Sequence, residues 1–517
     1  MMEKVFNTTG NCVPTKHYMV NIEEKLKKIK RMIDRAYYFT INRGRQYGKT
    51  TTLFQLETFL ADDYTVISLT FERMGQSSFS SEAVFCQKFL EIIVDALGET
   101  GYLWKNQDVD DFERLSKHIT AQCQNKRIVL MIDEVDKASN FQVFLGFLNM
   151  LRSKFIDRNN SRGATFHSVI LVGVYDIKNI KFKMVQEGSH QLTPNEVEQN
   201  SPWNIAERFN VDMSFSPEEI STMLIDYEND YQVGMNVATV ATEIHNYTNG
   251  YPVLVSTLCR YMDEGLSQNF SNAGVEEAVR RLLRETDNEL FKSLAQNVEK
   301  NEHVRKLLYD VLILGERRSF FTDNSVVDLT YRYGYIREVN ERIKISNRIF
   351  EMRLGNYFIS KTENGSDQKV NGGVIYEITK NNTFNMPLCL ERFKLHWAEI
   401  SSGKDAKLLE RECRLFFLTY LKPILNGVGF YFIESALTDD RRMDVVVIYN
   451  QQRFVLELKI WKGELYNEQG VEQLLGYMDK LDEETGYLLT FDFRKKPERI
   501  KPTWRKESGK KVFEVRV

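Results

Sequence analysis

Arg43-Gly44-Arg45-Gln46-Tyr47-Gly48-Lys49-Thr50-Thr51 lies between an apolar run at residues 37–41 and a helix-like stretch at residues 52–56. Strand, glycine-bearing loop, Lys-Thr and helix is the order that a phosphate-binding loop requires. The backbone N–H groups of such a loop and the N-terminus of the next helix bind phosphate oxygens. We expect Lys49 to reach the β- and γ-phosphates and Thr50 to place its hydroxyl on Mg²⁺. The segment predicts a nucleoside triphosphate site.

The spacing of this loop departs from the general pattern. Gly-x-x-x-x-Gly-Lys-[Ser/Thr] would place its first glycine at position 43, where this chain has Arg43, and Gly44 comes one residue late. A basic loop with a chance Gly-Lys-Thr is the alternative, because short motifs also match by chance. A strand that ends in acidic residues, further along the same domain, would favour a phosphate-binding loop over a chance match.

Residues 127–136 supply that acidic strand. Their β-branched apolar run suits a strand buried on both faces of a parallel sheet. Asp133 and Glu134 stand at its carboxyl end, where open α/β sheets bind ligands. We expect Asp133 to hold Mg²⁺ and Glu134 to orient and deprotonate the attacking water. An acidic strand end alone is usually a solvated turn, but paired with the upstream loop it favours an ATP or GTP site.

Composition limits the class of protein. At 517 residues, the chain is long enough for about three domains. A net charge of -3 excludes a globally basic nucleic-acid coat, but leaves room for local basic patches. The 6 cysteines form no C-x-x-C pair, which favours reduced thiols over disulfides or zinc. We expect a cytoplasmic protein without a membrane partner, since neither a signal-peptide core nor a membrane-length apolar run is found.

Strands and helices alternate around the loop. Strand patterns at residues 64–69 and 168–174 are interleaved with helical patterns at residues 83–97, 109–122 and 141–155. Such alternation predicts an α/β domain with a parallel sheet and right-handed crossovers.

Several motifs of the sequence together resemble those of a known family of ATPases. The motifs Arg45-Gln46-x-Gly48-Lys49-Thr50 and Asp133-Glu134-Val135-Asp136, with residues 6–10 and 16–18, resemble prokaryotic AAA-like ATPases of the archaeal and signal-transduction type. The resemblance continues through residues 201–205 and 248–252. It implies a P-loop ATPase core over residues 1–200 and a helical lid over residues 201–290.

The resemblance also implies roles for single residues. The nucleotide would be bound by Arg45, Gln46, Gly48, Lys49, Thr50 and Thr51. Gly250 and Pro252 would open a lid helix, although a plain helix-start turn looks the same. His17 and Tyr18 would contact the base, with a packed N-terminal arm as the alternative. Tyr175 and Asp176 occupy the strand end where such ATPases often sense the γ-phosphate.

The middle of the chain suits a small helical domain with a β-wing, over residues 291–360. Residues 305–314 and 323–333 are helix-like, and residues 334–337 and 342–345 could pair as the wing. The resembled ATPases carry a winged helix here, which either binds DNA or serves as an interdomain or autoinhibitory module. Residues 361–373 are polar and glycine-bearing, which is typical of a linker.

Residues 374–517 carry a second chemical signature. Residues 441–449 and 453–460 read as two strands joined by a short turn at residues 450–452. Glu457 and Lys459 are two positions apart, so both side chains leave the same face, and a hairpin would bring Asp444 to the same end. Two carboxylates and an ammonium on one edge predict a metal-dependent phosphodiesterase site.

The flanks of this hairpin suggest a second family. The order α-β-β-α-β, with Asp444, Glu457-x-Lys459 and Gln473-x-x-x-Tyr477, resembles the PD-(D/E)XK restriction-endonuclease-like fold. Met443 replaces the proline of that name. The resemblance implies catalysis by Asp444, Glu457 and Lys459. It also implies a metal, Mg²⁺ or Mn²⁺, on Asp444, Glu457 and Glu412, and a supporting role for Gln473. A solvated charged strand is the alternative.

Basic residues gather in the tail and could contact phosphates, although most basic tails are merely solvated. They are Arg494, Lys495, Lys496, Arg499, Lys501, Arg505, Lys506, Lys510 and Lys511. We expect the aromatic side chains of Trp461 and Trp504 to pack rather than stack on bases.

The leading hypothesis is a prokaryotic ATPase fused to a Mg²⁺-dependent nuclease-like domain, in which the nucleotide state gates binding or cleavage of nucleic acid. DNA is the favoured partner, a homo-oligomer is possible, and defence, mobile-element or repair settings are all open. The alternative is a regulatory nucleotide switch whose C-terminal domain binds nucleic acid or a partner without cleaving. A DNA-translocating motor is a third hypothesis; it requires hexamers and an arginine finger, for which Arg208 is the one candidate.

Overall fold

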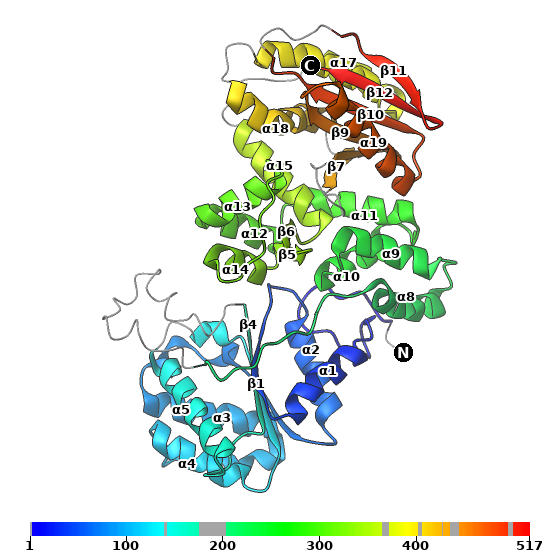
Figure 1. Ribbon diagram of the computed structural model, residues 1–517. Coiled ribbons are helices and arrows are strands. Elements are labelled where there is room, and N and C mark those ends of the chain that lie inside the picture. The colour runs from blue at the N-terminus through cyan, green and yellow to red at the C-terminus, as the bar shows by residue number, and fades with distance from the viewer. Residues whose placement is uncertain are drawn as a thin grey trace. The chain divides into compact units, whose positions relative to one another are not determined.

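The computed structural model describes residues 3–138, 142–174, 203–363, 372–401, 406–425, 428–434, 444–494 and 500–517. The chain divides into two compact units (Figure 1). The first contains Met1–Asp226 with Arg332–Gly334, and the second contains Tyr227–Tyr331 with Tyr335–Val517. Within the described residues, no helix is both long and apolar enough to cross a bilayer.

The first unit is built on a parallel sheet, as predicted. Its strands are β1 (Tyr38–Asn42), β2 (Thr65–Thr70), β3 (Ile128–Asp133) and β4 (Ser168–Gly173), in the order β1-β4-β3-β2. All neighbouring strands pair in parallel. Every residue of β3 and β4 is buried, as expected for strands covered on both faces. The carboxyl ends of β1 and β3 therefore lie at the same edge of the sheet.

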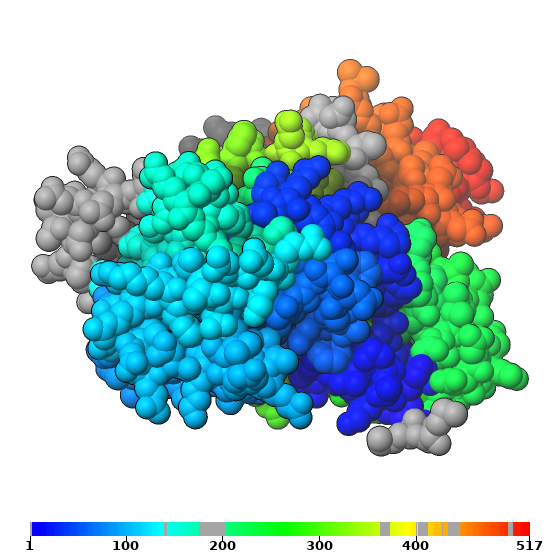
Figure 2. Space-filling model, turned by 90° about the horizontal axis from the view of Figure 1, so that it is seen from below, coloured from blue at the N-terminus to red at the C-terminus, as the bar shows by residue number. Residues whose placement is uncertain are grey.

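Helices cover both faces of this sheet (Figure 1). They are α1 (Glu23–Asp34), α2 (Lys49–Leu60), α3 (Glu82–Leu97), α4 (Phe112–Cys123) and α5 (Gln142–Asn159). Short 3-10 turns lie at Phe71–Arg73, Gln76–Phe79, Gly98–Trp104 and Val135–Ala138. Phe85 and Phe89 of α3 pack against Phe147 of α5 in the apolar core of this unit. Much of the blue to cyan surface in Figure 2 belongs to this unit.

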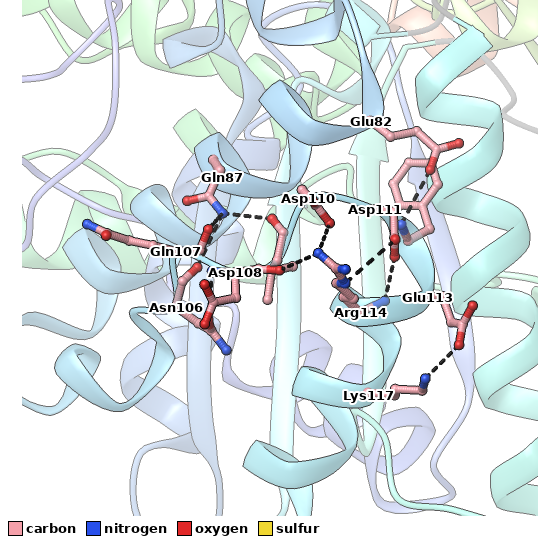
Figure 3. Close-up of polar contacts among 12 residues, drawn as sticks. Glu82, Gln87, Asn106, Gln107, Asp108, Asp110, Asp111, Glu113, Arg114 and Lys117 are labelled. Atoms are coloured by element: carbon pink, nitrogen blue, oxygen red, sulfur yellow. Dashed lines mark hydrogen bonds and ion pairs between the residues drawn. The ribbon is translucent and has the colours of Figure 1, made fainter.

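The loop before α4 is held by side-chain hydrogen bonds (Figure 3). A carboxylate oxygen of Asp111 accepts a hydrogen bond of 2.7 Å from the backbone N–H of Arg114. This N-cap starts α4 at Phe112, three residues after the predicted start at position 109. The amide of Gln87, on α3, donates to the carbonyls of Asn106, Gln107 and Val109. The loop is thereby tied to the helical layer on that side of the sheet.

The second unit begins with helices. They are α8 (Pro217–Tyr231, which starts in the first unit), α9 (Val237–Thr248), α10 (Pro252–Arg260), a π-helical turn (Tyr261–Gly265), α11 (Asn272–Arg284), α12 (Glu289–Lys300), α13 (Glu302–Leu312), α14 (Ser325–Arg332) and α15 (Arg348–Glu363). The antiparallel strands β5 (Ile336–Val339) and β6 (Arg342–Ile345) form a hairpin where the wing was predicted. Helix α15 runs into the predicted linker, of which residues 364–371 lie outside the described part of the chain.

The C-terminal part of this unit contains a mixed sheet. Its strands are β7 (Gly429–Glu434), β8 (Asp444–Tyr449), β9 (Gln452–Ile460), β10 (Thr485–Phe491), β11 (Thr503–Glu507) and β12 (Lys510–Arg516), in the order β11-β12-β10-β9-β8-β7. Strands β7, β8 and β9 pair antiparallel, whereas β9, β10 and β12 pair in parallel. The predicted hairpin is β8–β9, while β7, β11 and β12 were not predicted.

Helices cover both faces of the mixed sheet. They are α16 (Gly372–Ile378), α17 (Met386–Ile400), α18 (Ala406–Leu425) and α19 (Glu464–Leu481), with a 3-10 turn at Lys380–Asn382. Leu474 of α19 belongs to the same apolar cluster as Val455 and Leu488. On α17, the ring of Trp397 lies 5.0 Å from that of Phe491. Since Leu488 and Phe491 are three positions apart on β10, α17 and α19 lie on opposite faces.

Candidate functional site

The loop between β1 and α2 curls tightly around the start of the helix. Gly48 is the N-cap of α2 and has φ 73°, in the left-handed region that glycine adopts without steric cost. Gln46 also has a positive φ of 55°. The first turn of α2 begins at Lys49, and its backbone N–H groups have no acceptors within the helix. These features are what an anion-binding loop requires.

The ammonium of Lys49 is held inside the curl of this loop. The residue is only 8% exposed, and its Nζ donates to the carbonyl oxygens of Arg43 at 3.1 Å and Gly44 at 2.9 Å. Burial lowers the pKa of Lys49, and the negative charges of Asp133 and Glu134 oppose that shift. A buried cation whose direct partners are neutral carbonyls fits a triphosphate, because the phosphate charge would offset its desolvation.

Thr50 and Asp133 meet at the edge of the sheet. The hydroxyl of Thr50 donates to a carboxylate oxygen of Asp133 at 2.6 Å, and the other carboxylate oxygen accepts from the backbone N–H of Glu134 at 2.9 Å. Asp133 is the last residue of β3 and is 5% exposed. A hydroxyl and a carboxylate side by side are oxygen ligands suited to Mg²⁺. The structure thus brings together two residues predicted to hold the metal.

Glu134 has an unusual backbone conformation. Its φ is 54°, which costs energy for a residue with a side chain and often marks a functional position. Burial, followed by the negative charge of Asp133, raises the pKa of its carboxyl group. A raised pKa suits the predicted role, because a general base works best when its pKa lies near the working pH.

Asp136 belongs to this edge of the sheet, although it was not among the predicted site residues. Its Oδ2 accepts a hydrogen bond of 2.5 Å from the backbone N–H of Val174. A Cβ on Gly173 would lie 2.8 Å from the same oxygen, so a side chain there would force the carboxylate to shift. The glycine at the end of the predicted strand, Gly173, was the sequence feature that could have pointed to this contact. Tyr175 and Asp176, the predicted γ-phosphate sensor, lie outside the described residues.

The N-terminal arm reaches the start of α2. The backbone N–H of Cys12 donates to the hydroxyl of Thr51 at 3.3 Å. His17 accepts a hydrogen bond from the backbone N–H of Val13 at 2.8 Å, and burial lowers the pKa of its imidazole. Tyr18 is 2% exposed, and its ring lies 5.0 Å from that of Phe6. His17 and Tyr18 therefore pack the arm, and their contact with a base stays a prediction.

The remaining predicted nucleotide residues have simpler surroundings. The side chains of Arg45, Gln46 and the candidate finger Arg208 are exposed. Gly250, with φ 70°, precedes α10, and Pro252 is its first residue, in the second unit. This is the helix-start turn that the sequence predicted, and the lid role of both residues stays a prediction.

The C-terminal site is centred on β9. Glu457 and Lys459 are each 1% exposed, and Nζ of Lys459 lies 2.7 Å from Oε1 of Glu457. The same ammonium donates to Oε1 of Gln473, on α19, at 2.5 Å. A Cβ on Gly470 would lie 3.1 Å from Cε of Lys459, so this glycine lets α19 approach the strand. Three predicted residues are therefore joined in one buried network.

Two further predicted ligands, Asp444 and Glu412, come from a neighbouring strand and a helix. Asp444 is the first residue of β8, and Val445 pairs with Leu456, so its backbone stands at the same end of the ladder as Glu457. Glu412 lies on α18, which packs against α15 and β7. Within the described residues, Glu412 makes no side-chain hydrogen bond or ion pair. Residues 435–443, with Met443, lie outside the described part of the chain.

The fit of a metal at β9 depends on Asp444. Across the described side chains, no three His, Cys, Asp or Glu residues are grouped as a cation site. The described network offers one carboxylate, from Glu457, and its charge is balanced by the ammonium of Lys459. A divalent cation needs at least one more carboxylate here, and the register of β8 favours Asp444.

Carboxylates balance part of the basic tail. The ion pairs join Arg494 with Asp492, Arg505 with Glu468, and Lys510 with Asp479, at 2.6 to 2.7 Å. Such pairing favours the solvated alternative over phosphate contact for these three residues.

The guanidinium of Arg516 lies 3.3 Å from the ring centroid of Trp461, which therefore packs as predicted. Trp504 is 49% exposed, with its ring 4.8 Å from that of Phe513, whereas Lys495, Lys496 and Arg499 lie outside the described residues.

Comparisons with known proteins give matches among solved structures. The chain is similar to a Walker-type ATPase of Pyrococcus abyssi, with 10% identity and a TM-score of 0.44 over 68% of this chain and 99% of that one. It is also similar to the ORC2 protein of Aeropyrum pernix, with 12% identity and a TM-score of 0.35 over 70% and 99% of the two chains. A third similar structure is Cdc6p from Pyrobaculum aerophilum, with 13% identity and a TM-score of 0.33 over 68% of this chain and 97% of that one. No protein-family model and no curated protein matches the sequence. At these scores the similarities carry no inference about activity.

Proposed function

We propose that the first unit binds ATP with Mg²⁺ and hydrolyses it. The observation that carries this proposal is the hydrogen bond of 2.6 Å between Thr50 and Asp133, which joins the start of α2 to the end of β3. The buried ammonium of Lys49 lies in the adjoining loop. A helix N-terminus, a buried cation and a hydroxyl–carboxylate pair at one edge of a parallel sheet are suited to a nucleoside triphosphate.

Each of these groups has a distinct task. The backbone N–H groups of the loop and the first turn of α2 bind phosphate oxygens, and Lys49 exchanges its carbonyl partners for the β- and γ-phosphates. Thr50 and Asp133 would hold Mg²⁺, which would neutralise the negative charge that develops on the transferred phosphoryl group. Glu134 orients the attacking water and accepts its proton, which its raised pKa favours.

Separating binding from turnover tests this proposal. Glu134→Gln keeps the shape of the site but cannot accept a proton. We expect it to bind ATP as the wild type does and to release phosphate at least about 100-fold more slowly. The matched control is Glu113→Gln on α4, whose side chain is 77% exposed. Wild-type phosphate release by Glu134→Gln would overturn the assignment of the base.

We propose further that the C-terminal mixed sheet carries a metal-dependent phosphodiesterase site of the nuclease-like kind. The network of Glu457, Lys459 and Gln473 supports it, together with the antiparallel β8–β9 pair and the parallel β10. Asp444 and Glu457 would hold Mg²⁺ or Mn²⁺, and Lys459 would position the attacking water. Nucleic acid, with DNA favoured, is the substrate that this chemistry fits, and nucleotide state would gate access to it.

The alternative is a C-terminal domain that binds nucleic acid or a partner without cleaving it. The near-complete burial of Glu457 and Lys459 favours this alternative, because a catalytic pair must be reached by substrate. Cleavage assays with Mg²⁺ and Mn²⁺, with and without ATP, distinguish the two. Wild-type cleavage that Glu457→Gln abolishes supports the nuclease. Binding of DNA or RNA that neither protein cleaves under any of these conditions supports the binding module.

A further inference from the structure

The second unit contains an ion pair between a helix of the predicted lid and the strand of the candidate nuclease site. The guanidinium of Arg453, on β9, lies 3.3 Å from Oε1 of Glu276, on α11. The same guanidinium lies 3.9 Å from Oε1 of Glu483, which follows α19. Arg453 therefore stands between α11 and the end of the helix that covers β9.

Arg453 shares a strand face with the candidate site. Arg453, Val455, Glu457 and Lys459 are alternate residues of β9, so their side chains leave the same face of the sheet. Helix α19 is joined to that face twice, through Gln473 to Lys459 and through Glu483 to Arg453. A displacement of Arg453 therefore acts on the strand and on the helix that together hold the ammonium of Lys459.

Other contacts fix the lid helices to the same sheet. Nη1 of Arg280, on α11, donates to the carbonyl oxygen of Val428, just before β7, at 2.8 Å. Tyr247, on α9, is 1% exposed, and its ring lies 6.5 Å from that of Phe430 and 6.4 Å from that of Phe432 on β7. Buried aromatic packing of this kind transmits a displacement from one element to the next, because interiors are close-packed. Helices α9 and α11 are thus built onto the mixed sheet.

The ion pair is partly withdrawn from water, which makes its loss consequential. The side chain of Glu276 is 15% exposed, and burial raises the pKa of its carboxyl group against the opposing charge of Arg453. Removing one member of a desolvated pair leaves the other charge uncompensated, whereas fully exposed pairs are worth little.

We propose that Arg453 is a positioning residue through which the lid helix α11 sets the geometry of the Glu457–Lys459 site. The proposal rests on the proposed nucleotide function. The gating proposed above would reach β9 and α19 through the Glu276–Arg453 pair, which would carry any displacement of α11 to them. The C-terminal site is then switched by a contact within the second unit, without any nucleotide at the mixed sheet.

Hydrogen exchange of the full-length protein tests this coupling without requiring cleavage. Amide exchange is measured for peptides that cover β9 and α19, with and without ATP and Mg²⁺, while ATP affinity is measured on the same samples. We expect ATP to change exchange in these peptides by at least about twofold in the wild type. Glu276→Gln and Arg453→Gln should bind ATP normally and lose that response.

A charge-swapped protein and a matched control separate coupling from general damage. Glu276→Arg combined with Arg453→Glu re-forms the pair with reversed charges and should recover the response to ATP. Glu468→Gln removes a different ion pair of α19, that with Arg505, and should respond like the wild type. The coupling is overturned if the wild type binds ATP without any response at β9 and α19, or if both single variants respond normally. A wild type that binds no ATP would overturn the nucleotide function itself.

Discussion

The hydroxyl of Thr50 lies 2.6 Å from a carboxylate oxygen of Asp133, across 83 residues of sequence. Thr50 belongs to the first turn of α2, and Asp133 ends β3. The pair exists because β1 and β3 are parallel strands of one sheet, whose carboxyl ends share an edge. Two oxygen ligands are thereby fixed beside the loop that would hold the phosphates.

Removing the hydroxyl of Thr50 should weaken the use of Mg²⁺. We expect Thr50→Ala to raise the Mg²⁺ concentration needed for half-maximal ATP hydrolysis by about 10- to 100-fold, since one oxygen ligand is lost. Thr50→Ser keeps the hydroxyl and should stay near the wild type. Thr58→Ala, on the solvent-facing side of the same helix, is the control. Equal Mg²⁺ dependence in Thr50→Ala and the wild type would exclude this role.

Glu134 should make stability depend on pH. Its pKa is raised above the ordinary value of 4.5, so the native state binds the proton more tightly than the unfolded state does. Stability from this group therefore falls as pH rises from the ordinary to the raised pKa. We expect Glu134→Gln to raise the melting temperature above the raised pKa, with no gain below the ordinary one. Thermal unfolding across pH measures this, and a gain that persists at acidic pH would contradict it.

A side chain at position 173 should destabilise the protein. A Cβ there would lie 2.8 Å from Oδ2 of Asp136, at the edge of the nucleotide site. We expect Gly173→Ala to lower the free energy of unfolding by about 1–3 kcal/mol, because overpacking displaces the carboxylate. Gly163→Ala is the matched control, since no atom lies within 4 Å of its added Cβ. Denaturant unfolding of the two variants compares them, and equal stabilities would show that Asp136 yields freely.

The Glu457–Lys459 pair should behave as a buried ion pair. Each residue is 1% exposed, so removing one partner leaves an uncompensated charge. We expect Lys459→Met to lower the free energy of unfolding by about 3–5 kcal/mol, and Glu457→Gln with Lys459→Met to lower it by less. Glu299→Ala breaks an exposed pair with Lys361 and should leave stability close to that of the wild type. A double variant less stable than Lys459→Met would contradict this description.

The sequence reveals those features that depend on local order. The loop with Lys49, the apolar strand ending in Asp133 and the β8–β9 hairpin each follow from short patterns, and the structure contains all three. Glu457 and Lys459 could be paired in advance because alternate strand residues share a face. Strands β11 and β12 were not predicted, because their many charged residues were interpreted as a basic tail.

Features that depend on tertiary contacts could not be predicted in the same way. The hydrogen bond from the backbone N–H of Val174 to Asp136 joins the end of β4 to the turn after β3, and the ion pair of Arg453 with Glu276 spans 177 residues. No periodicity marks such partners. Glu412 was predicted from a helical pattern, and its role as a metal ligand stays a prediction.

Direct ATP binding tests the central claim, that the loop at residues 43–51 holds the phosphates of ATP. The affinity of the full-length protein for ATP with Mg²⁺ would be measured by calorimetry for the wild type, Lys49→Ala and Lys117→Ala, whose lysine on α4 is 73% exposed. We predict saturable binding by the wild type and by Lys117→Ala, and a loss of at least about 100-fold for Lys49→Ala. Wild-type affinity in Lys49→Ala would contradict the claim.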